Sequence, residues 1–69
     1  MLDSPVNLLL KNIIDFNKSS QQAIYIQISQ QIMNAIQRKY LTKGTLLPGT
    51  RVLSKLLKIH RNTAVAVYD

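Results

Sequence analysis

The chain of 69 residues contains no cysteine, so neither a disulfide nor a thiolate metal site can stabilise it. A domain of this size buries only about 60% of the surface that its unfolded chain exposes, and its stability is therefore marginal. We expect further stabilisation from a partner chain or from residues outside this sequence. The absence of cysteine also fits a reducing cytoplasm.

Acidic residues are scarce as well, at three against nine lysines and arginines, which gives a formal net charge of +6. No Asp or Glu lies between Phe16 and Tyr68, whereas seven basic residues fall between positions 38 and 61. These are Arg38, Lys39, Lys43, Arg51, Lys55, Lys58 and Arg61. Such a field attracts polyanions and raises encounter rates. Charge alone leaves a merely soluble basic domain as the alternative.

No apolar run approaches the roughly 18 residues that a membrane-spanning helix needs. The longest leucine run, Leu8 to Leu10, is broken by Lys11 and Asn12. The start Met-Leu-Asp lacks the positive region of a signal peptide. The sequence therefore predicts a soluble cytoplasmic protein with no membrane partner. A membrane-surface peptide is disfavoured, because the basic residues lie on a turn-rich segment rather than on one amphipathic face.

The side chains that catalysis or metal binding requires are also missing. The chain has a single histidine, His60, with no nearby Asp or Glu to orient it, and it has no cysteine nucleophile or paired carboxylates. We predict that the chain is not an enzyme and holds no metal.

The pattern divides the chain into an N-terminal arm and linker at residues 1–22 and a second part at residues 23–69. Ser4 followed by Pro5 is typical of a helix start, which favours a short helix in the arm. A short extended piece near Ile13 to Asp15 is the alternative. Either form leaves apolar side chains that need a partner surface. Those side chains are Val6, Leu9, Leu10, Ile13 and Ile14.

Three further helices are predicted, which makes the chain all-α. The first runs from Ala23 to about Arg38, and its apolar stripe is expected to be core. That stripe comprises Tyr25, Ile28, Ile32 and Ile36. The second helix runs from about Thr50 to Leu57, after turns at Lys43-Gly44 and Pro48-Gly49. The third starts near Arg61. The expected inward residues are Val52, Leu53, Leu56 and Leu57 on the second helix, and Ala64, Val67 and Tyr68 on the third.

Between the last two helices lies the short turn Lys58 to His60, with Ile59 as its buried plug, which is the pattern of a helix-turn-helix. In that unit the first helix crosses the DNA backbone and the second enters the major groove by its N-terminal residues. Arg61 can pair with guanine or phosphate, and Asn62 with adenine or the backbone. The predicted DNA-binding residues are Thr50, Arg51, His60, Arg61, Asn62 and Thr63.

Each of these residues has an ordinary structural alternative. Arg61 and Asn62 could be solvated surface residues, and Arg51 could form a structural salt bridge. His60 is expected to cap the third helix, with a phosphate contact as the rival role. Thr63 either caps or packs against Ile59, or binds a phosphate oxygen beside the helix N-terminus.

Residues 24 to 69 resemble the N-terminal winged-helix domain of GntR-family transcription regulators. The resemblance rests on Tyr25-Ile26-Gln27-Ile28, Ile32…Ala35-Ile36, Leu41…Gly44…Leu47-Pro48, Arg51…Leu53-Ser54…Leu57 and Arg61-Asn62-Thr63. The runs Leu47 to Arg51, His60 to Thr63 and Ala66 to Asp69 are most similar to the MocR subfamily. There the winged helix is joined to a large domain like a fold-type I aminotransferase, which binds pyridoxal phosphate.

The resemblance implies DNA contacts at Arg51 and at His60 to Thr63. It also implies a homodimer on double-stranded operator DNA, with the effector bound by a C-terminal domain that this sequence lacks. The sequence departs from the family at Lys39, where the family usually has glycine, and at Lys58, where the family often has glycine. Left-handed backbone would cost roughly 1–2 kcal/mol at each lysine, and the alternative is a differently shaped helix end.

The family's β-hairpin wing and its pyridoxal phosphate lysine are also missing, so we expect an incomplete winged helix and no cofactor in this chain. The alternative hypothesis is a self-associating or protein-interaction fragment that uses the apolar arm and the last helix.

Overall fold

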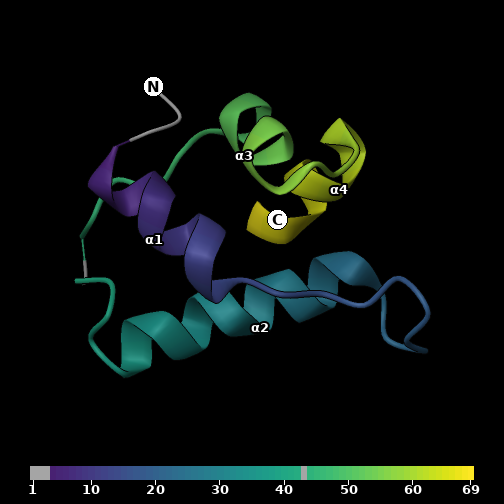
Figure 1. The fold of residues 1–69 in the computed structure, drawn as a ribbon, viewed down its shortest axis with the longest axis horizontal. Helices are drawn as coiled ribbons and strands as arrows, with labels where there is room; N and C mark the ends of the chain where they lie inside the picture. Colours follow the sequence, from purple (N-terminus) through teal and green to yellow (C-terminus); the bar gives the residue numbers. More distant parts are fainter. Residues whose placement is uncertain (1–3, 43) are drawn as a thin grey trace.

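The computed structural model describes residues 4–42 and 44–69, and it forms four helices with no strand in those ranges. The helices are α1 (Pro5–Ile13), α2 (Ile24–Gln37), α3 (Thr50–Leu57) and α4 (Arg61–Tyr68). Figure 1 shows α2 along one side of the molecule, with the other three helices above it. α4 contacts both α2 and α3, and α1 contacts α3. The predicted all-α class is confirmed. Asp3 and Lys43, with its predicted turn, lie outside the described residues.

Helix α1 begins as the sequence predicts and continues into the core. The Ser4 hydroxyl accepts a hydrogen bond from the Asn7 backbone N–H at 3.2 Å, and Pro5 occupies the first helical position. The helix ends at Ile13, and Ile14 adopts extended backbone. Leu10 and Ile14 are buried with residues of α2, α3 and α4. The apolar side of the expected arm therefore finds its partner surface within the same domain.

Two glutamines of α2 hold the chain segment that follows α1. Gln31 accepts from the Asp15 backbone N–H at 2.8 Å and donates to the Asp15 carbonyl. Gln27 accepts from the Asn17 backbone N–H at 2.9 Å and donates to the Asn17 carbonyl at 3.1 Å. It also donates to the carbonyl of Gln22. Residues four apart on a helix are about 6.0 Å apart along its axis, which matches the roughly 6.6 Å between alternate residues of an extended chain. The segment thus runs along α2 (Figure 1).

The hydrophobic core comes from all four helices. Its fully buried side chains include Leu10, Ile28 and Leu53. The other buried members are Ile14, Ile32, Ala35, Leu41, Leu56, Ala64 and Val67. Of the other predicted inward residues, Leu57 and Ile59 pack half-buried against this core, and Val52 is half-buried.

Three predicted core residues are instead exposed. Tyr25 is 41% exposed, Ile36 37% and Tyr68 36%. The buried face of α2 follows Ile28, Ile32 and Ala35, so it is rotated away from the predicted stripe. The apolar pattern of α2 is wider than the surface that the other helices cover, and periodicity alone could not show which edge stays uncovered.

Both helices that precede turns end in left-handed lysines. Lys39 has a φ of 65° and Lys58 a φ of 56°. After α2 the Tyr40 N–H donates to the Ala35 carbonyl at 2.9 Å, and after α3 the Ile59 N–H donates to the Ser54 carbonyl at 3.0 Å. These are the hydrogen bonds that close a helix with a left-handed residue, a position where glycine is usual. Lys39 and Lys58 therefore both have the left-handed backbone for which glycine is the usual residue.

None of the helices in the described part of the chain has the length and apolar character to cross a membrane.

Candidate nucleic-acid interface

The helices α3 and α4 with the turn between them have the predicted bounds. α3 covers Thr50–Leu57, α4 begins at Arg61, and Lys58 to His60 connect them. The turn is fixed by the left-handed Lys58 and by Ile59, which packs half-buried against the core. α3 and α4 pack directly on each other, so the orientation of the α4 N-terminus is set by the core. Local helix signals and one apolar turn residue were sufficient to predict this unit.

His60 caps α4 through its imidazole. The backbone N–H of Asn62 donates to His60 Nδ1 at 3.0 Å, and the Ala64 N–H donates to the His60 carbonyl at 3.1 Å. Because Nδ1 accepts, the ring proton of this neutral tautomer is on Nε2, which stays a donor. The cap role of His60 is confirmed, and it leaves Nε2–H of the exposed imidazole for a second partner.

The first turn of α4 presents polar side chains on its outer side. Arg61 and Asn62 are exposed, Thr63 is half-buried, and Ala64 is fully buried against the core. The turn contains no acidic residue. The helix dipole adds positive potential at this end, so Arg61, Asn62 and the N-terminal amides together favour an anionic partner.

The other two predicted site residues lie at the start of α3. Thr50 is its first residue and is half-buried, and Arg51 is exposed. Gly49 precedes the helix and supplies no side-chain cap. The guanidinium of Arg51 makes no hydrogen bond or ion pair within the described residues, so the alternative role as a structural salt bridge has no partner there. The six predicted residues thus fall into two groups, one at each helix N-terminus.

A contact that the sequence did not reveal joins the two helices. The hydroxyl of Tyr68, in the last turn of α4, donates to the carbonyl of Pro48 at 2.6 Å, just before α3. Partial burial raises the pKa of the Tyr68 phenol. Tyr68 was predicted as core; its ring is instead at the surface, where its hydroxyl positions α4 against the residues that lead into α3. A tyrosine at an apolar helical position was the available signal, because its hydroxyl needs a partner.

The exposed cations of this region stand without acidic neighbours. Arg51, Lys55, Lys58 and Arg61 are all exposed on α3, α4 and their connection. No ion pair is formed within residues 4–42 and 44–69. Each of these charges is therefore available to an external anion.

No protein-family model, no curated protein and no solved structure matches the chain. The resemblance to GntR regulators therefore stays a prediction from the quoted residues.

Proposed function

We propose that this chain is the sequence-specific DNA-binding part of a bacterial transcription regulator, with the N-terminal turn of α4 entering the major groove. The observation that carries the proposal is the short fixed turn from Lys58 to His60, which presents exposed Arg61 and Asn62 on a helix whose opposite side is held by the core. A helix positioned in this way is the reading element of helix-turn-helix proteins.

Some of these side chains suit contacts to DNA bases, and others suit contacts to phosphates. Arg61 offers a planar fork of donors for guanine or phosphate, and the amide of Asn62 can both donate to and accept from adenine. Thr50, Thr63 and Nε2–H of His60 suit phosphate oxygens beside helix N-termini. Arg51 adds a charged backbone contact from α3. The proposal includes pairing of two copies on a two-fold operator, since dimeric helix-turn-helix proteins read two half-sites.

Binding can be tested with a labelled duplex of mixed sequence, about two helical turns or ~21 base pairs long. We expect weak, salt-dependent binding by this chain, in the nonspecific range of roughly 10⁻⁴ to 10⁻⁶ M. Arg61→Gln should weaken binding and reduce the slope of log K against log salt by about 0.9, because one phosphate contact is lost.

The matched control is Lys18→Gln, which removes one exposed charge far in sequence from α3 and α4. It should change binding much less than Arg61→Gln does. Equal effects of the two variants would show that net charge alone attracts DNA and would exclude α4 as the reading element. Selection from a random duplex pool, repeated with Asn62→Ala, then tests whether α4 reads bases.

A second candidate function, self-association, is favoured by an apolar groove between α2 and α4. The groove has a volume of about 260 Å³, and its sides include Tyr25, Met33 and Tyr68, all of them exposed. Sedimentation equilibrium of the chain and of Met33→Glu tests this candidate. A concentration-dependent dimer that Met33→Glu abolishes would support it, and a strict monomer at millimolar concentration would exclude it.

A further inference from the structure

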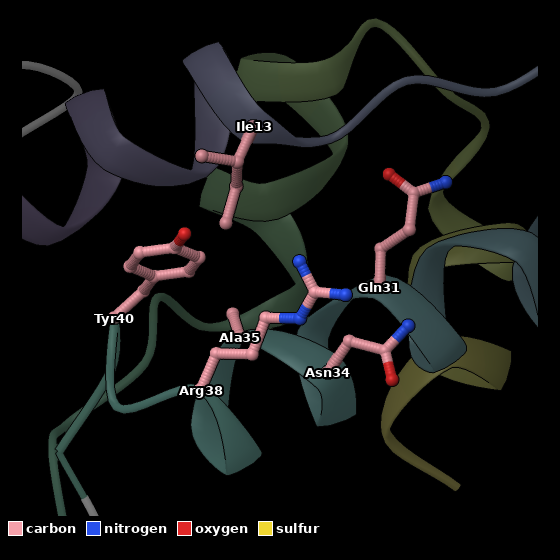
Figure 2. Close-up of a pocket in the computed structure, with 6 residues that line it drawn as sticks. All are labelled: Ile13, Gln31, Asn34, Ala35, Arg38 and Tyr40. Atoms are coloured by element: carbon pink, nitrogen blue, oxygen red, sulfur yellow. The ribbon is translucent and has the colours of Figure 1, made fainter.

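A small pocket lies between the end of α1 and the C-terminal half of α2, on residues that the DNA-binding proposal does not use. It has a volume of about 200 Å³. Figure 2 shows the Arg38 guanidinium in the middle of the lining side chains, between the Tyr40 ring and the amides of Gln31 and Asn34. Ile13 and Ala35 supply its apolar walls.

Some polar side chains of this pocket already form hydrogen bonds within the protein, and others do not. Both amide atoms of Gln31 are bound to the Asp15 backbone. The Arg38 guanidinium, the Tyr40 hydroxyl and the Asn34 side-chain amide form no hydrogen bond or ion pair within the described residues. Three neighbouring groups thus offer donors toward one small space, and the guanidinium alone carries five N–H groups in a planar fork.

The electrostatics of the pocket favour an anion. Its lining holds one cation and no carboxylate. The negative end of the α2 dipole opposes an anion here, but its carbonyls are largely satisfied. The Asn34 carbonyl accepts from the Arg38 N–H at 2.9 Å, and the Ala35 carbonyl accepts from the Tyr40 and Leu41 N–H groups. Arg38 is therefore the one charged side chain in the pocket lining.

We propose that this pocket binds an oxyanion, the carboxylate or phosphate group of a small molecule, with Arg38 as a two-pronged donor. The Tyr40 hydroxyl and the Asn34 amide donate to the same oxygens from either side. Ile13 and Ala35 contact the apolar part next to the anionic group. The forked geometry of arginine suits carboxylate and phosphate oxygens better than a point charge does.

The test is an NMR titration of the full chain with sodium acetate and, separately, sodium phosphate, at constant ionic strength set with sodium chloride. Saturable shifts of the Arg38 Nε–H, the Asn34 side-chain amide and the Tyr40 ring are expected. Arg38→Gln should weaken binding at least tenfold, and Tyr40→Phe, which keeps the ring, should weaken it several-fold. The spectra of both variants also show whether the fold is retained.

Lys18→Gln is the matched control, since it removes one exposed positive charge from a residue that does not line the pocket. If it weakens binding as much as Arg38→Gln does, or if no saturable shifts occur near Arg38, the pocket is not an oxyanion site. A final comparison measures duplex DNA binding of Arg38→Gln. Unchanged DNA affinity assigns the site to a small molecule, whereas reduced affinity assigns it to a DNA phosphate.

Discussion

Lys39 and Lys58 occupy backbone conformations in which the Cβ atom of an L-residue meets the following carbonyl, at a cost of roughly 1–2 kcal/mol. Each stays there because the helix end is closed by a hydrogen bond that only a left-handed residue allows. Their side chains are exposed, so a substitution changes backbone energy without disturbing the core.

Replacing Lys58 by glycine should raise the free energy of unfolding by about 0.5–1 kcal/mol. Glycine adopts the left-handed region without the clash, and its greater freedom in the unfolded chain offsets part of the gain. Urea unfolding measures the change. Lys55→Gly, an exposed position inside α3, should instead lower the free energy of unfolding by about 1 kcal/mol. A loss of stability in both variants would contradict the prediction.

The partial burial of Tyr68 should make stability depend on alkaline pH. Burial raises the pKa of the phenol above its ordinary value of 10.0, so the folded chain holds this proton more tightly than the unfolded chain. The contribution is complete below that ordinary value and is lost as pH rises through the raised pKa. Thermal unfolding between about pH 8 and about pH 11 should therefore decline more steeply for wild type than for Tyr68→Phe. Parallel curves would show that this tyrosine does not contribute.

At the scale of elements, the pairing of α2 with the extended segment can be tested through single amides. Gln31→Ala removes both hydrogen bonds to the Asp15 backbone, at a cost of about 1 kcal/mol each. The Asp15 amide should then exchange with solvent hydrogen markedly faster. Gln30→Ala is the control, since Gln30 is exposed on the same helix and forms no side-chain hydrogen bond within the described residues. Faster exchange in both variants would point to general loosening of α2 instead.

How far the sequence predicted each element depended on whether its determinants are local. The bounds of α3 and the start of α4 follow from Pro48-Gly49, the apolar periodicity and a turn with one apolar residue, and all were correct. The glutamine pairing was not predicted, because a glutamine on a helix surface gives no sign of which backbone it will meet. The Arg38 pocket was missed for the same reason, since its wall at Ile13 arrives from a helix distant in sequence.

At the scale of the whole molecule, one core residue should decide whether the chain folds. Leu53 is fully buried in the core, and Leu53→Ala should cost about 2–5 kcal/mol. A domain this small has little stability to lose, so circular dichroism should show a largely unfolded chain. Leu46→Ala, at a side chain 90% exposed, should leave the melting temperature unchanged. A cooperative, wild-type-like transition for Leu53→Ala would contradict the packing described.

The scarcity of carboxylates should give folding and the proposed DNA binding opposite responses to ionic strength. The exposed cations repel one another without an ion pair inside residues 4–42 and 44–69, so added salt screens that repulsion and favours the compact state. The same salt weakens attraction to a polyanion, because counterion release contributes less. Raising sodium chloride from about 50 to about 200 mM should increase the melting temperature while it lowers DNA affinity. The folded state is thus expected to be most stable at the salt concentrations at which DNA binding is weakest.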